Sequence, residues 1–192
     1  MKAQKGMPKQ YGPWQIRATE VKFRDEFMEV NQDQVIRPDG KPGTYSTVQM
    51  KPGVAVLPID ERGTVYLTKQ FRYGLGAESL EVVCGAIDPG ERAAEAARRE
   101  LREELGIQAK EWTELGTMQL DTSMICAPAS LFVARQLSFG EPRQEGTETI
   151  RVEKLSLDEA VQAVLESRIV HGPSCVVILK AARSLEGVHG RE

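Results

Sequence analysis

The stretch Gly85-Ala86-Ile87-Asp88-Pro89-Gly90-Glu91 runs directly into a segment that ends Arg99-Glu100-Leu101-Arg102-Glu103-Glu104-Leu105-Gly106. Pro89 and Gly90 are turn residues, so the first part is predicted to be a loop. Residues 93–105 are almost all strong helix formers. Gly106 stands where a helix often ends in a left-handed residue. The stretch therefore predicts a loop that leads into a helix.

The predicted helix has two distinct faces at about 100° per residue. One face is a narrow apolar stripe formed by Ala94, Ala97, Leu101 and Leu105, and the adjacent face carries Glu100, Glu103 and Glu104. Like charges at this spacing repel by a few tenths of a kcal/mol per pair. One interpretation is a solvated acidic face, relieved by nearby arginines. The other is a site for a hard cation such as Mg²⁺, which prefers oxygen ligands.

The spacing favours the second interpretation. The stretch resembles the signature of the Nudix hydrolases, G-x5-E-x7-R-E-U-x-E-E-x-G-U, in which U is a bulky aliphatic residue. Every fixed position is matched, by Gly85, Glu91, Arg99, Glu100, Leu101, Glu103, Glu104, Gly106 and Ile107. The resemblance implies an α/β fold, namely a Nudix-type α/β/α sandwich with a mixed sheet. It also implies hydrolysis of a diphosphate linkage with Mg²⁺, or with Mn²⁺ in its place.

The same resemblance implies roles for individual residues. Glu100 and Glu104 are expected to bind the metal, with Glu103 as a third ligand that also belongs to the catalytic set. Cys84 is expected to contribute its backbone carbonyl. Glu91 and Arg99 are expected to pair and hold the loop against the helix.

A further catalytic acid is expected outside the helix, in the charged segment 141–152. Glu148-Thr149-Ile150-Arg151-Val152 resembles the acidic junction between loop and strand in ADP-ribose pyrophosphatases. Glu148 matches best, and Glu145 is the second candidate. The alternative is a solvated loop without a catalytic role.

Softer similarities extend to the ADP-ribose/ADP-sugar pyrophosphatase branch of the family. They cover residues 32–41, 65–73 and Leu80-Glu81. Arg72 is a candidate contact for the diphosphate, since a guanidinium matches phosphate oxygens, although it could also be an ordinary surface arginine. Glu81 is expected to support the substrate site from the preceding strand. These similarities favour a nucleoside diphosphate sugar as substrate, cleaved to a nucleoside monophosphate and a sugar phosphate.

One segment departs from that branch. Residues 121–130 lack the expected Ser-Pro-Gly, and Ala127 stands about where an acid is expected. This departure leaves GDP-mannose as the nearest competing substrate. Dinucleoside polyphosphates, nucleoside triphosphates and coenzyme A remain as other Nudix substrates. A sensor without catalysis is disfavoured by the intact glutamates.

Around the helix, the pattern predicts short strands and two further helices. Residues 1–48 are expected to form an antiparallel β extension that acts as a dimerisation arm, 49–186 the Nudix domain and 187–192 a tail. The lead-in 1–12 is expected to be flexible. Strands are predicted at 15–23, 27–36, 43–50, 54–59, 64–70, 79–84, 112–120, 129–136 and 149–155, with 54–59 and 64–70 forming a hairpin, and helices at 157–165 and 175–185.

Composition limits the partners. The formal net charge is −3, which argues against a surface that binds nucleic acid through bulk charge. No run of about 18 apolar residues suggests a membrane span, and the N-terminus does not resemble a signal peptide. Three cysteines without a C-x-x-C motif favour a reducing compartment, hence the cytoplasm. The family resemblance implies a homodimer that acts on a nucleoside diphosphate sugar.

Overall fold

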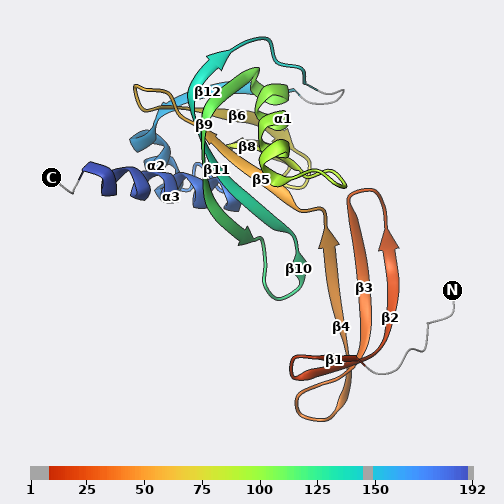
Figure 1. Ribbon diagram of the computed structural model, residues 1–192. Helices are drawn as coiled ribbons and strands as arrows, with labels where there is room; N and C mark the ends of the chain where they lie inside the picture. The colour runs from red at the N-terminus through yellow and green to blue at the C-terminus, as the bar shows by residue number, and fades with distance from the viewer. Residues whose placement is uncertain (1–8, 145–148, 190–192) are drawn as a thin grey trace. The chain divides into compact units, whose positions relative to one another are not determined.

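The computed structural model describes residues 9–144 and 149–189, with side chains up to residue 184 (Figure 1). The chain divides into two compact units. The first contains residues 1–51 and 119–127, and the second contains residues 52–118 and 128–192. Each unit is described by itself.

The first unit is a five-stranded sheet in the order β1-β2-β3-β4-β10. Its strands are β1 (Lys9–Tyr11), β2 (Trp14–Arg24), β3 (Met28–Ile36), β4 (Pro42–Met50) and β10 (Ile125–Cys126). Strands β1 to β4 form an antiparallel meander, and β10 is parallel to β4. The three predicted strands are confirmed. The prediction of a flexible lead-in is wrong for residues 9–11. These residues form β1, because Gly12 adopts a φ of 54° and turns β1 back onto β2.

The second unit contains a four-stranded sheet, β8-β5-β11-β9, and a three-stranded sheet, β12-β6-β7. Strand β5 (Gly53–Pro58) is antiparallel to β8 (Val83–Ala86) and parallel to β11 (Pro128–Phe139), and β9 (Ile107–Gln119) follows at the edge. Strand β6 (Thr64–Arg72) lies between β7 (Ala77–Glu81) and β12 (Arg151–Ser156). Parallel and antiparallel pairs occur together, as predicted for a mixed sheet.

The hairpin predicted from 54–59 and 64–70 is wrong as a paired unit. The turn itself forms, because Asp60 accepts backbone hydrogen bonds from Arg62, Gly63 and Thr64. Beyond the bridge between Ile59 and Val65, however, the two strands enter different sheets. The backbone groups of β5 are already paired on both sides, with β8 and β11, so β6 takes other partners.

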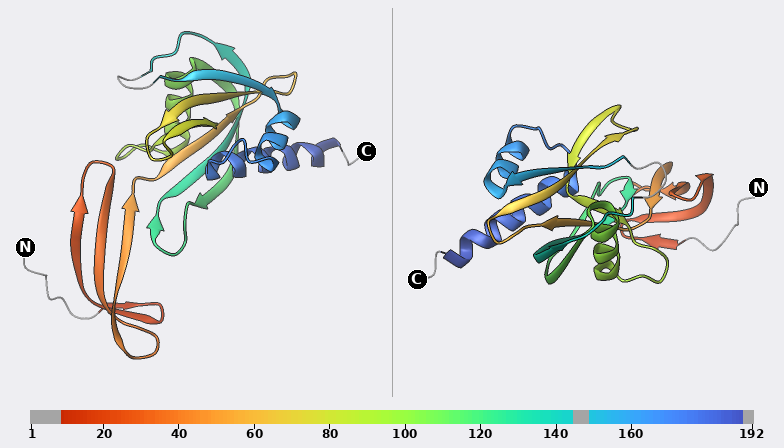
Figure 2. Two further views of the ribbon diagram at one scale, coloured as in Figure 1. Left: turned by 180° about the vertical axis from the view of Figure 1, so that it is seen from behind. Right: turned by 90° about the horizontal axis from the view of Figure 1, so that it is seen from above.

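Two cores lie on opposite faces of β5 and make the sandwich. Val54 and Val56 pack with α1 (Ala93–Leu105), whereas Ala55 and Leu57 pack with α2 (Leu157–Leu165) and α3 (Gly172–His189). Alternate side chains of a strand point to opposite faces, so one buried strand can support both layers. Figures 1 and 2 show the helices on either side of this sheet. The predicted α/β/α sandwich is confirmed.

The helix boundaries follow local signals. Helix α1 ends at Gly106, whose φ of 65° is left-handed, and Ser156 and Glu159 form the capping box of α2. Helix α3 begins at Gly172, three residues before the predicted start. In α1, Ala97, Leu101 and Leu105 are buried as predicted, but Ala96 is more buried than Ala94.

Among the described residues, no helix is both long and apolar enough to cross a membrane.

Replacing Leu101 with alanine tests the packing of α1. Leu101 is fully buried against both sheet and helix neighbours, so its truncation should lower the free energy of unfolding by about 2–5 kcal/mol. Urea titration followed by circular dichroism measures the change. Leu165→Ala is the matched control, because Leu165 also lies on a helix but is 65% exposed, and should change stability by less than about 0.5 kcal/mol. Equal stability of Leu101→Ala and wild type would contradict the packing.

Candidate active site

Strand β8 and helix α1 meet where Gly85 faces Glu100. A Cβ placed on Gly85 would lie 1.9 Å from Cδ of Glu100 and 2.0 Å from its Oε1. Real atoms do not approach this closely without a bond, so only a glycine leaves room for this carboxylate against β8. The first glycine of the signature is therefore a steric requirement of a glutamate fifteen residues later.

Arg99 connects the loop to the acidic face of α1. Its Nε and Nη2 each donate to Glu91, both at 3.0 Å, and Nη2 also donates to the carbonyl oxygen of Ala86 at 2.9 Å. On the helix itself, Nη1 donates to Glu100 at 2.6 Å and to Glu103 at 3.2 Å. The predicted pairing of Glu91 with Arg99 is confirmed, and the arginine additionally bridges two of the three helix carboxylates.

Charge pairing shifts the ionisation of this group. The hydrogen bonds from Arg99 are the main cause that lowers the pKa of Glu91 below its usual value. In turn, the hydrogen bonds to Glu91 raise the pKa of Arg99, with Glu100 and Glu103 adding to the effect. Glu91 and Arg99 therefore both carry their charges at neutral pH.

Glu100, Glu103 and Glu104 are the side chains that could hold a metal ion. Within residues 9–144 and 149–184, no three His, Cys, Asp or Glu side chains stand in a metal-binding arrangement. Instead, one nitrogen of Arg99 lies within hydrogen-bond distance of both Glu100 and Glu103. Glu104, only 3% exposed, lies on the same side of the helix. These carboxylates thus offer hard oxygen donors, and they already bind the positive charge of Arg99. A divalent ion fits such donors and would replace contacts of Arg99.

Cys84, a residue of β8, lies close to these charged groups. Burial raises the pKa of its thiol well above the usual value, and the negative charges of Glu104 and Glu81 raise it further. The thiol is therefore protonated at neutral pH. A protonated thiol is a poor ligand, which agrees with the expectation that any contribution of Cys84 comes through its carbonyl.

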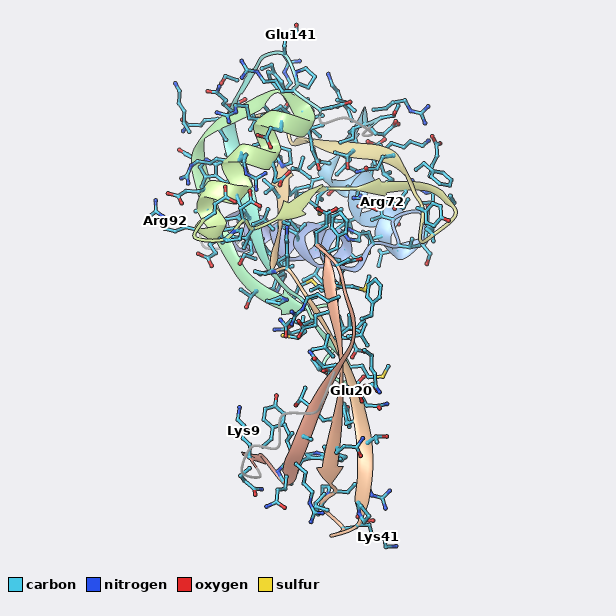
Figure 3. All side chains as sticks on the ribbon, turned by 90° about the vertical axis from the view of Figure 1, so that its right-hand side faces the viewer. Lys9, Glu20, Lys41, Arg72, Arg92 and Glu141 are labelled. Atoms are coloured by element: carbon cyan, nitrogen blue, oxygen red, sulfur yellow. The ribbon has the colours of Figure 1, made fainter. Side chains whose placement is uncertain are left out.

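Arg72 of β6, labelled in Figure 3, forms a second charged group with Glu81 at the end of β7. Nε of Arg72 donates to Oε1 of Glu81 at 3.1 Å, and Nη2 donates to Oε2 at 2.6 Å. Burial alone would raise the pKa of Glu81, but the hydrogen bond from Arg72 and the nearby His171 outweigh it, so the pKa lies below its usual value. The Glu81 side chain is 3% exposed and that of Arg72 is 41% exposed. Arg72 thus rests on a buried carboxylate while presenting part of its guanidinium outward.

No feature of the sequence indicates that the first turn of α3 joins this group. Nδ1 of His171 lies 2.8 Å from Oγ of Ser174 and 3.6 Å from Oε2 of Glu81. Ser174 in turn accepts a hydrogen bond from the backbone N–H of Val82 at 3.0 Å, across 92 residues of chain. Only the Gly-Pro dipeptide before Ser174 marks a helix start, and it says nothing about what the helix contacts.

The loop after β11 is attached to the end of α1. The backbone N–H of Gly140 donates to the carbonyl of Gly106 at 2.8 Å, and that of Arg143 donates to the carbonyl of Glu103 at 2.8 Å. The Gln144 amide donates to the carbonyl of Ile150 at 3.0 Å and to that of Glu104 at 3.3 Å. Glu145 and Glu148, the candidates for the further acid, lie outside the described residues, between these two anchored ends.

Residues 121–127 of the segment that departs from the expected pattern belong to the first unit, and residues 128–130 begin β11 in the second. The carboxylate of Asp121 accepts hydrogen bonds from the backbone N–H groups of Ser123 and Met124, which lowers its pKa to about 2. Ala127 is buried. A charged side chain at position 127 would therefore need a buried partner.

Comparison with known proteins agrees with this geometry. Residues 49–172 match the family model described as NUDIX domain, and residues 14–48 match the model described as nucleoside diphosphate sugar hydrolase N-terminal domain. The chain therefore belongs to the Nudix family and is a Nudix hydrolase, as its signature predicted. A divalent metal ion is the general requirement of this family.

Individual relatives carry this further. The chain is 30% identical to an ADP-ribose pyrophosphatase of Bacillus subtilis over 80% of this chain and 84% of the relative. It is 26% identical to a methanol dehydrogenase activator of Bacillus methanolicus over 83% of this chain and 88% of the relative. The crystal structure of an ADP compounds hydrolase shares the fold with a TM-score of 0.78 at 23% identity, covering 100% of both chains.

Gly85→Ala tests the contact between the loop and Glu100. The added methyl must displace the Glu100 carboxylate, so divalent-ion binding should weaken and turnover should fall by about a hundredfold, as expected for a misplacement of about 1 Å. Calorimetric titration with Mn²⁺ measures the first effect without any substrate. Gly74→Ala is the matched control, because a Cβ at Gly74 meets nothing within 4 Å. Unchanged Mn²⁺ affinity in Gly85→Ala would refute the role of this contact.

Proposed function

We propose that this enzyme hydrolyses the diphosphate bond of an ADP-ribose-like nucleoside diphosphate sugar and releases a nucleoside monophosphate and a sugar phosphate. Mg²⁺ is the proposed metal, with Mn²⁺ as a substitute. The observation that carries the proposal is the position of Cys84. Beyond the effect of burial, the pKa of its thiol is raised by Glu104, Glu81 and Glu100 and lowered by Arg72. A carboxylate cluster for a cation and an arginine for phosphate thus belong to one site.

Each group has a distinct part in this chemistry. Glu100, Glu103 and Glu104, with the backbone carbonyl of Cys84, would hold the ion. When bound, the ion would neutralise phosphate charge and make a water molecule more acidic. Arg72 would bind the diphosphate through the N–H groups that its pair with Glu81 does not use, since a guanidinium has five such donors. Glu81 would hold the arginine in place.

A base must accept the proton of the attacking water. Glu103 is one candidate, because it lies on the helix beside Glu100 and shares the Nη1 of Arg99 with it. Glu148 is the other, with Glu145 in reserve. The attachment of Gly140, Arg143 and Gln144 to the end of α1 supports this second assignment, since it ties the segment that carries both acids to the helix that carries the carboxylates.

The substrate class is supported by the relatives. The names of the matching N-terminal family model and of the Bacillus subtilis relative both refer to nucleoside diphosphate compounds of this type. The departure at residues 121–130 favours a second candidate, GDP-mannose, since that segment differs from the ADP-ribose pattern. The intact carboxylates favour an enzyme over a ligand sensor.

We further propose that the chain acts in the cytoplasm as a homodimer, with residues 1–48 as the dimerisation arm, 49–186 as the catalytic domain and 187–192 as a tail. Free cysteines support the compartment. Exposed apolar side chains on or beside β2 and β3 support the arm, namely Val21, Phe23, Phe27 and Met28. Sedimentation equilibrium should give about twice the chain mass of 21.3 kDa. A single-chain mass at micromolar concentration would overturn the dimer.

A substrate screen with Glu104→Gln tests the reaction. Wild type with Mg²⁺ is incubated with ADP-ribose, GDP-mannose, diadenosine tetraphosphate and coenzyme A, and the phosphate products are identified. We expect ADP-ribose to give AMP and ribose 5-phosphate. Glu104→Gln should lower turnover by orders of magnitude while unfolding free energy stays within about 1 kcal/mol.

Glu114→Gln is the control for the same change at an exposed glutamate on β9, and it should keep wild-type turnover. Full activity of Glu104→Gln would refute its assignment as a metal ligand. Tight binding of one compound without any turnover by wild type would favour the sensor instead.

A further inference from the structure

The start of α3 is attached to the junction between β7 and β8. Ser174 is fully buried and its Oγ accepts the backbone N–H of Val82, the residue that directly follows Glu81. Thr68 of β6 donates to the carbonyl of Glu81 at 3.3 Å. The backbone on both sides of Glu81 is therefore held, once by the neighbouring strand and once by the helix.

The ring of His171 faces the carboxylate of Glu81. Its Nδ1 is 2.8 Å from Oγ of Ser174 and 3.6 Å from Oε2 of Glu81. A lone pair on Nδ1 would point at a negative charge, whereas an N–H on Nδ1 would be attracted to it, so the tautomer with the proton on Nδ1 is favoured. Burial lowers the pKa of His171, and although Glu81 opposes this effect, the imidazole is neutral at neutral pH.

Glu81 is the support on which Arg72 rests. Both oxygens of this buried carboxylate accept from the Arg72 guanidinium, and Ser79 also bonds to the carboxylate. A buried carboxylate needs such partners on every side to stay charged. If Glu81 turned away, Arg72 would lose both of its bonds, because they converge on this one group.

We propose that His171 and Ser174, at the first turn of α3, are positioning residues that hold Glu81 and through it aim Arg72 at the diphosphate. The Nδ1 of His171 lies 3.6 Å from the same Oε2 of Glu81 that accepts from Arg72, and Ser174 binds both the imidazole and the backbone N–H of Val82. The guanidinium is thereby oriented before the substrate arrives, which lowers the ordering cost of binding.

The test rests on the proposed function and uses kinetics on whichever diphosphate substrate wild type hydrolyses. His171→Leu removes the hydrogen bond to Ser174 and the attraction to Glu81 but keeps an apolar side chain. It should raise KM about tenfold with kcat within about threefold, as expected when a contact that binds ground state and transition state equally is weakened. His171→Asn places an amide N–H near the position of Nδ1 and should recover most of this loss. Val177→Ala is the control, because it truncates a fully buried residue of the same helix outside this group, and its KM should equal that of wild type.

A double-mutant cycle separates positioning from general damage. If His171 acts through Arg72, then His171→Leu should have no further effect on KM in an Arg72→Ala background. Effects that multiply, or a Val177→Ala enzyme with the same rise in KM as His171→Leu, would overturn the proposal.

A readout without substrate keeps the proposal testable if wild type hydrolyses none of the compounds. The ¹H–¹⁵N resonance of the Arg72 Nε–H, assigned by its loss in Arg72→Ala, should be sharp and slow to exchange in wild type and in Val177→Ala. It should broaden in His171→Leu and sharpen again in His171→Asn. An unchanged Arg72 signal in His171→Leu would refute the positioning role, whatever the substrate proves to be.

Discussion

The arrangement of the site depends on the guanidinium of Arg99. It binds Glu91 in the loop, Ala86 at the end of β8, and Glu100 and Glu103 on α1, so one cation joins three segments that precede and form the helix. Without this charge, the carboxylates on one helix face would repel each other, and the loop would have no bond to hold it at the helix. The same charge also marks the place where carboxylate oxygens are drawn together.

Arg72, the second cation of the site, is held by a different kind of contact. Arg72 binds a single carboxylate, and that carboxylate is buried in the contact between β7 and the first turn of α3. The two arginines therefore differ in what fixes them. Arg99 is fixed by residues within eight positions of it, apart from Ala86, whereas Arg72 relies on a helix about a hundred residues later in the chain.

This difference explains which parts of the site could be predicted from sequence. The signature from Gly85 to Ile107 is local. Its residue types and spacing predict α1 and the acidic face, and its resemblance to the Nudix signature implies the pair of Glu91 with Arg99. The alternation of Val54 to Leu57 does not reveal that β5 is central and that β6 leaves for another sheet, because this depends on which strands pair at long range. Likewise, His171 and Ser174 look like ordinary helix-start residues until Val82 and Glu81 are placed beside them. Contacts that join distant segments leave no periodic trace in either one.

The loop after β11 is also held by contacts between segments that are distant in the sequence. A Cβ at Gly106 would lie 2.3 Å from the carbonyl oxygen of Gly140, so this glycine serves both the end of α1 and the close passage of the next segment. Gln144 then joins the carbonyl of Glu104 to that of Ile150, on the far side of the segment that carries Glu145 and Glu148. The end of α1 and the loop after β11 therefore constrain the same residue. A side chain at position 106 would push the loop away from the carbonyl oxygens of Glu103 and Glu104, which now accept hydrogen bonds from Arg143 and Gln144.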